Sequence, residues 1–146
     1  DGVRLVSAVL GSGWGDAGKQ KKWTDTKVLM DYGFAVFHPY EAVQAGKPFG
    51  EIRITDSPTT QMETILAEGY TALFSDAEIE KLHLTADLPK ELAAPVHRGE
   101  RLGQAVLWLG EERLAAVDLL AAEDAMPYTL AQRLLRLAER WLSWRD

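Results

Sequence analysis

The sequence has no cysteine among its 146 residues, which excludes a disulfide framework, a thiolate zinc site and a cysteine nucleophile. It is also short of positive charge, because 16 Lys and Arg residues stand against 22 Asp and Glu, for a net charge of −6. A general nucleic-acid binder needs a basic face, so we expect no nucleic-acid partner. The hydrophobic content of 47% and charged content of 26% are typical of a globular chain with a core.

Familiar catalytic and metal-binding patterns are missing as well. None of the serines is followed three residues later by lysine, and neither Lys-Thr-Gly nor Gly-x-Ser-x-Gly occurs. The three histidines stand apart, without a second ligand at helix or hairpin spacing. We therefore expect no catalytic residue, no metal site and no cofactor in this chain.

We expect no signal peptide in the first residues, because no basic stretch is followed by an apolar one. Residues Val3–Leu10 are instead apolar on both faces and rich in β-branched side chains, the pattern of a strand covered on both sides. A natural protein seldom begins inside such a sheet, so we expect the sequence to be a fragment. We predict that strand 3–10 pairs with another copy, giving a homo-oligomer, or packs on the domain that follows.

A glycine-rich loop, residues 11–18, precedes a predicted helix at about Lys19–Tyr32, with Gly33 as its C-terminal cap. Within the loop, residues 13–18 formally match the Gly-x-Gly-x-x-Gly pattern of dinucleotide-binding proteins. Such an enzyme needs further alternating strands and helices, whereas the rest of the chain predicts strands. We favour a surface loop, and a nucleotide-binding enzyme remains the weakest alternative.

From Tyr40 onward, short β-rich segments alternate with turn signals. The predicted strands are Phe49–Thr55, Gln61–Ala67, Tyr70–Phe74, Lys81–Leu88, Arg101–Leu109 and Arg113–Ala121. Residues 107–114 are predicted to form a hairpin around Gly110. Strands this short and regular predict a mainly β fold, a small antiparallel β-sandwich.

The sequence ends in a predicted amphipathic helix that starts at Pro127 and has Thr129 as its N-cap. Its apolar stripe and its arginines are the candidate site residues: Leu130, Leu134, Leu137, Trp141 and Trp144, with Arg133, Arg136 and Arg140. Residues 129–146 carry a net charge of +2, which leaves −8 on the preceding 128 residues. Four arginines exclude a bilayer span. The helix either packs on its own domain or lies in a membrane interface, with its tryptophans among the headgroups and its arginines near anionic lipid.

Taken in order, several short sequence segments resemble the C-terminal part of a penicillin-binding D-alanyl-D-alanine carboxypeptidase. Residues 1–11 resemble the strand that follows the Lys-Thr-Gly strand of that family. The next loop and the last helix of the catalytic domain are matched by Gly13-Trp14, Lys22-Trp23, Asp25-Thr26-Lys27 and Asp31-Tyr32-Gly33-Phe34. The family's small C-terminal β-domain is matched by Ala94-Pro95-Val96 through Gly99, Leu102 and Gly103, and by Val117-Asp118-Leu119-Leu120.

The resemblance implies a division of the chain into three parts. Residues 1–37 would be the terminal strand and helix of a truncated catalytic domain, and residues 38–126 the C-terminal β-sandwich. Residues 127–146 would be an amphipathic membrane-associated helix. The fold class is therefore a mainly β sandwich, preceded by a strand-helix remnant and followed by the amphipathic helix.

The resemblance also implies a function for the whole enzyme, which would trim the D-Ala-D-Ala end of peptidoglycan stem peptides through an activated serine and an acyl-enzyme that penicillin traps. Its catalytic motifs would precede Asp1, so no catalytic residue carries over. This chain would position the catalytic domain of the parent protein relative to the membrane or a partner, peripheral to the outer face of the bacterial cell membrane. The alternative is a β-sandwich interaction module whose C-terminal helix binds a protein groove.

Overall fold

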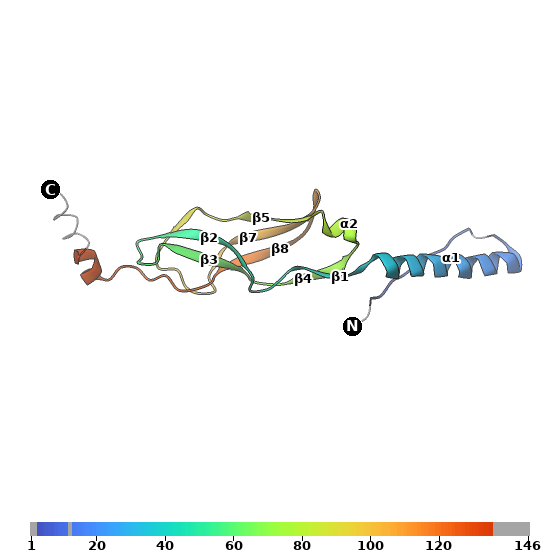
Figure 1. The fold of residues 1–146 in the computed structure, drawn as a ribbon, viewed down its shortest axis with the longest axis horizontal. Coiled ribbons are helices and arrows are strands. Elements are labelled where there is room, and N and C mark those ends of the chain that lie inside the picture. The colour runs from blue at the N-terminus through green and yellow to red at the C-terminus, as the bar shows by residue number, and fades with distance from the viewer. Residues whose placement is uncertain (1–2, 12, 136–146) are drawn as a thin grey trace.

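A computed structural model describes residues 3–11 and 13–135 of the chain. One long helix precedes a β-domain, and a short helical segment begins at Leu130 (Figure 1). The elements are α1 Gly15–Val36, β1 His38–Val43, β2 Pro48–Thr55, β3 Gln61–Leu66, β4 Tyr70–Phe74, α2 Asp76–Ile79, β5 Leu82–Asp87, β6 Glu91–Ala93, β7 Arg101–Leu109 and β8 Glu112–Ala121.

The strands form a sheet of two and a curled sheet of six. The small sheet pairs β1 with β4, and the large sheet has the order β5-β7-β8-β3-β2-β6. Every pairing is antiparallel except that of β2 with the three-residue strand β6. The predicted fold class is confirmed: the chain is mainly β, with a helix before the strands and a short helix after them.

The core of the β-domain consists of two apolar clusters. Ile52, Ile54 and Met62 anchor the cluster toward the C-terminal end, and Val43, Leu107 and Leu119 anchor the other. Val43 belongs to the small sheet and the other two belong to the large sheet, so this second cluster fills the space between the sheets. It is the sandwich contact that the alternating pattern of the sequence predicts.

The predicted hairpin and all six predicted strands are confirmed within a residue or two at each end. β7 and β8 are joined by the two-residue turn Gly110-Glu111, with Gly110 at φ +59°, the left-handed region that glycine tolerates. Sequence reasoning missed β1, β6 and α2. Pro39 is acceptable in β1 because this strand has only one paired edge among the described residues.

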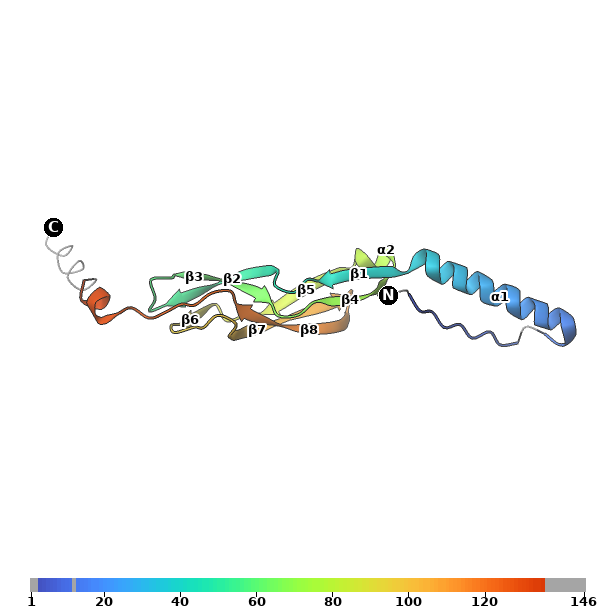
Figure 2. The ribbon, with the colours of Figure 1, turned by 90° about the horizontal axis from the view of Figure 1, so that it is seen from below.

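Residues 3–10, predicted as a strand, belong to neither sheet of the described chain, and their pairing with another copy stays a prediction. The segment is extended but pairs with no strand of the described chain, and it runs beside α1 (Figure 2). Exposure alternates along it: Val3, Leu5, Ser7 and Val9 are partly buried, and the residues between them are exposed. One face of the segment therefore lies on the helix, and its other apolar face is open.

The contact with this segment also explains why the prediction of Gly33 as a helix cap is wrong. α1 begins at Gly15 and continues to Val36, so Gly33 lies inside the helix. Gly33 is buried, and a Cβ added to it would come within 2.5 Å of the Leu5 Cδ1 atom. Glycine at this position permits the close approach of Leu5 and does not end the helix.

The molecule is elongated. α1 lies at one end of the β-domain and the helical segment from Leu130 at the other, in both views (Figures 1 and 2). β8 alone has ten residues, which corresponds to about 33 Å at ~3.3 Å per residue. The strands thus run along the axis that separates the two ends.

Candidate functional site

The candidate helix at the C-terminal end begins with a well-formed cap. The backbone N–H of Thr129 donates to Gln132 Oε1 at 2.9 Å, and the Gln132 N–H donates to Thr129 Oγ1 at 3.4 Å. This reciprocal pair is a capping box, which satisfies N–H groups that the first turn leaves free. Thr129 is the N-cap that the sequence predicts.

The described part of the helix is not packed on the β-domain. Leu130 is 80% exposed and Leu134 66% exposed, and Arg133 is also exposed. The remaining predicted site residues lie outside the described residues; they are Arg136, Leu137, Arg140, Trp141 and Trp144. Leu130 and Leu134 are therefore both exposed to solvent on this helix, which indicates a contact with another surface.

The segment that leads to this helix is held to the end of the β-domain by residues that sequence reasoning had treated only as a turn. Ser57 is 3% exposed, and its Oγ donates to the Met126 carbonyl oxygen at 2.8 Å. The Tyr128 N–H donates to the Asp56 carbonyl oxygen at 3.0 Å. Backbone hydrogen bonds between Ala125 and Val96 in both directions complete the attachment. The direction in which the helix leaves the domain is therefore fixed up to Tyr128.

A second apolar surface lies at the opposite end, on α1 and the extended segment. Large exposed side chains occur on several sides of the helix and along the segment: Val6, Leu10, Trp14, Trp23, Val28, Leu29, Tyr32 and Phe34. Val6 and Trp14 are 99% and 98% exposed. A shallow cleft of about 280 Å³ runs between the segment and the helix, bordered by Val9, Lys19 and Trp23. We call this area the α1 surface.

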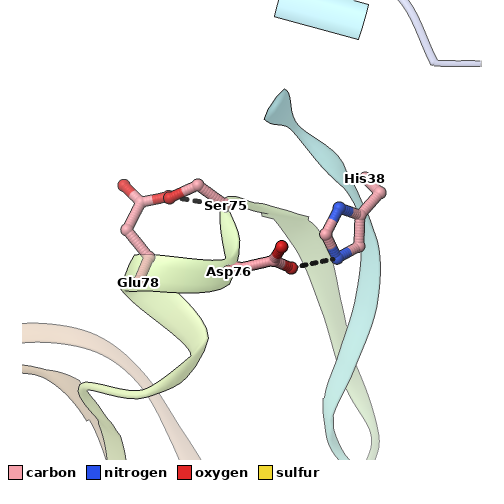
Figure 3. Close-up of polar contacts among 4 residues, drawn as sticks. All are labelled: His38, Ser75, Asp76 and Glu78. Atoms are coloured by element: carbon pink, nitrogen blue, oxygen red, sulfur yellow. Dashed lines mark hydrogen bonds and ion pairs between the residues drawn. The ribbon is translucent and has the colours of Figure 1, made fainter. Parts of the chain in front are cut away.

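The joint between α1 and the β-domain is short. Phe37 is the only residue between the helix and β1, and its N–H donates to the Gly33 carbonyl oxygen at 3.0 Å. The next residue, His38, places its Nε2 atom 3.4 Å from the Asp76 Oδ1 atom at the start of α2 (Figure 3). The helix is thus joined to the domain without a flexible linker.

α2 itself is fixed by the Ser75–Glu78 pair (Figure 3). The Glu78 carboxylate accepts hydrogen bonds from the Ser75 N–H and the Ser75 Oγ, each at 2.8 Å. The backbone bond from Ser75 is the main cause that lowers the pKa of Glu78 below its usual value, followed by the Ser75 hydroxyl and the charge of Lys81. The ionised carboxylate is therefore the form that holds this turn.

Residues 3–11 and 13–135 contain no group of three or more His, Asp or Glu side chains that could hold a metal ion. No helix in the same part of the chain is long and apolar enough to span a membrane. The described residues instead contain two exposed apolar surfaces, one at each end of the β-domain.

Comparison with known families assigns this β-domain. The family described as penicillin-binding protein 5, C-terminal domain, matches residues 37–126. The chain belongs to this family. The resemblance read from the sequence is thereby confirmed. Residues 3–36 precede the penicillin-binding protein 5 C-terminal domain, and the helix from Leu130 follows it.

The chain is also similar to individual relatives. It is 26% identical over 125 residues to D-alanyl-D-alanine carboxypeptidase DacA of Haemophilus influenzae, an alignment that covers 84% of this chain and 30% of that protein. The crystal structure of penicillin-binding protein 5 from Haemophilus influenzae aligns over 73% of this chain and 31% of its own, with a TM-score of 0.56 and 21% identity.

A further structure, D-alanyl-D-alanine carboxypeptidase DacD from Francisella tularensis, aligns over 78% of this chain and 29% of its own, with a TM-score of 0.53 and 17% identity. At these identities the two structural matches establish the fold alone. The chain spans about a third of the length of these relatives.

Proposed function

We propose that this chain is the non-catalytic C-terminal region of a D-alanyl-D-alanine carboxypeptidase. Its β-domain would hold the catalytic domain at a distance from the outer face of the bacterial membrane. The observation that carries the proposal is the pair of exposed apolar surfaces at opposite ends of an elongated β-domain (Figure 1). A spacer needs one attachment surface at each end.

The α1 surface is the proposed attachment to the catalytic domain. Residues 3–10 alternate between a face on α1 and an exposed face that carries Val6 and Leu10. Apart from Arg4, the exposed residues of this segment are apolar, which is the pattern of a strand covered on both faces. The Haemophilus influenzae relative is longer than this chain, since the alignment covers only 30% of it, and its additional part would cover this exposed face.

The C-terminal helix is the proposed attachment to the membrane. Leu130 and Leu134 are exposed. In the sequence, the apolar stripe continues to Leu137, Trp141 and Trp144. Arginines flank the stripe on a chain whose remaining part is strongly acidic. Arginine beside an apolar face favours an anionic lipid surface, at about 1 kcal/mol for each residue near the surface. The acidic β-domain would be repelled by the same surface and kept away from it.

The joint at Phe37 and His38 supports a spacer that transmits a fixed orientation. A flexible linker would let the catalytic domain swing, whereas α1 continues into β1 after a single residue. The contact of His38 with Asp76 and the capped turn α2 hold the same end of the domain (Figure 3).

Labelling with a fluorescent penicillin tests the family activity. The 146-residue chain is compared with a chain extended upstream through the Ser-x-x-Lys, Ser-x-Asn and Lys-Thr-Gly motifs. We expect the extended chain to be labelled and the short chain to remain unlabelled. Absence of labelling in both would contradict the carboxypeptidase assignment and favour an interaction module whose helix binds a protein groove.

A further inference from the structure

The two-stranded sheet leaves one edge of β1 without a partner. β1 pairs only with β4, and no other strand of the described residues bonds to its second edge. An unpaired edge presents a row of free N–H and C=O groups, which is a template for another strand. Pro39 has no N–H and blocks the start of this edge, so the part that remains available lies from Tyr40 onward.

A cleft of about 300 Å³ follows the available part of this edge. Its border includes five consecutive residues, Tyr40–Gln44. Successive side chains of a strand point to opposite faces, so a cavity over one face would touch every second residue. Contact with five in a row indicates that the cleft lies along the backbone edge of β1. We call it the β1 cleft.

The floor and rim of the β1 cleft differ in character. Leu66 is buried, and Phe49 and Leu84 are half-buried, which gives the cleft an apolar floor. Glu41 and Lys47 stand exposed at its rim, and neither has an ion-pair partner among the described residues. The cleft therefore offers backbone bonds, one apolar contact and two opposite unpaired charges.

We infer that the β1 cleft binds an extended segment of a partner protein as a third strand on β1. Backbone hydrogen bonds to Glu41, which shares the free edge with Pro39, supply affinity, in the manner of strand addition to a free edge. An aliphatic side chain of the segment lies on the floor of Phe49, Leu66 and Leu84. An acidic side chain faces Lys47 and a basic one faces Glu41. The inference is independent of the proposed membrane-facing role.

The probe is a blocked peptide of sequence Lys-Val-Leu-Val-Glu, titrated into the isotopically labelled 146-residue chain. We expect its largest amide shift changes at Tyr40–Gln44, together with slower hydrogen exchange of the edge amides. Lys47→Glu is expected to weaken binding about two- to fivefold, as for an exposed ion pair. Lys47 is exposed, so this variant retains the fold. No shift at Tyr40–Gln44 at millimolar peptide would overturn the inference.

Two N-methylated forms of the same peptide provide the matched control. One is methylated at both valines and lacks both N–H groups of that edge, and the other is methylated at the leucine and lacks the central N–H group of the opposite edge. One form should bind about tenfold more weakly or worse, because hydrogen bonds to β1 are lost, and the other should bind nearly as before. Equal binding of the two forms would exclude strand addition. Binding of the dipeptide D-Ala-D-Ala to the cleft in place of the probe would assign it to a cell-wall ligand and overturn the inference.

Discussion

At the scale of single residues, two strand glycines illustrate how much the surroundings decide. Gly103 in β7 and Gly50 in β2 both lie beside an irregularity in strand register. A Cβ added to Gly103 would collide with the Asp87 carbonyl oxygen and come within 2.8 Å of the Leu88 Cδ2 atom, whereas one added to Gly50 would meet nothing within 4 Å. The two positions look alike in the sequence, and only the packing distinguishes them.

Gly103→Ala is expected to lower the free energy of unfolding by about 1–3 kcal/mol, because the backbone of β5 must shift to admit the methyl group. Gly50→Ala, the matched control, should change it by about 0.5 kcal/mol or less. Urea unfolding followed by circular dichroism measures both. Equal effects of the two substitutions would contradict the close approach at Gly103.

Ser57 is a buried polar residue that fixes the segment leading to the C-terminal helix. Ser57→Ala removes the hydroxyl that binds the Met126 carbonyl oxygen and accepts the Thr59 N–H. The expected loss of stability is about 1–3 kcal/mol, the cost of leaving buried polar groups unpaired. Thr59→Ala keeps the same backbone donor and is expected to cost about 0.5 kcal/mol or less. A loss in Thr59→Ala as large as in Ser57→Ala would contradict this account.

At the scale of elements, the sequence predicts what depends on alternation and fails where tertiary contacts decide. The six predicted strands have alternating or β-rich patterns, and β3, with Met62, Thr64 and Leu66 inward, shows why alternation suffices. β6 has three residues and exists because its backbone pairs with β2. Residues 3–10 look like a strand but lie on a helix, since the neighbours they would need are not among the described residues.

α2 was missed although its signal was present, because Ser75 followed three residues later by Glu78 is a capping-box pattern. Thr129 is the N-cap of the candidate helix, as predicted, but the helix begins at Leu130 and not at Pro127. Its membrane role stays a prediction, as does the division of the chain at residues 37 and 126.

The contribution of the capped turn α2 to the stability of the fold should depend on pH. Because the pKa of Glu78 is lowered in the folded chain, its contribution to stability is present above the usual glutamate pKa of about 4.3 and is lost as the pH falls through the lower folded value. Glu78→Gln should therefore be less stable than the parent chain near pH 7, and the difference should shrink as the pH falls below the usual glutamate pKa. Thermal unfolding across this range measures it. Glu80→Gln, whose carboxylate makes no hydrogen bond in the described residues, should leave this part of the profile unchanged.

The exposed leucines of the C-terminal helix give a second prediction at this scale. Leu134→Glu should reduce binding to anionic vesicles about tenfold or more, since it places a charge in the apolar stripe, and should leave the melting temperature unchanged because Leu134 is exposed. Leu135→Glu is the control, because Leu135 is 64% exposed but lies off the stripe. Flotation on vesicles that contain phosphatidylglycerol measures both variants. Equal loss of flotation in the two variants would argue against an oriented helix.

At the scale of the whole molecule, the chain is a β-domain with exposed apolar side chains at each end. The domain shares its family with the C-terminal domain of penicillin-binding protein 5, and its strands run along the long axis (Figure 2). Sequence reasoning could find both ends as apolar patterns, but it could not show that they lie on opposite sides. That arrangement follows from the hairpin β7–β8 and from the hydrogen bond between Ser57 and Met126. Together they direct the segment after β8 away from α1.

Site-specific fluorescence on vesicles tests this arrangement most directly. The chain has no cysteine, so Lys19→Cys on α1 and Ala131→Cys on the C-terminal helix each accept a single fluorescent donor, with the energy acceptor placed on the lipid headgroups. The account predicts strong energy transfer from position 131 and little or none from position 19, since the β-domain separates them by more than about 33 Å. Equal transfer from the two positions would mean that the molecule lies flat on the membrane and would contradict its role as a spacer.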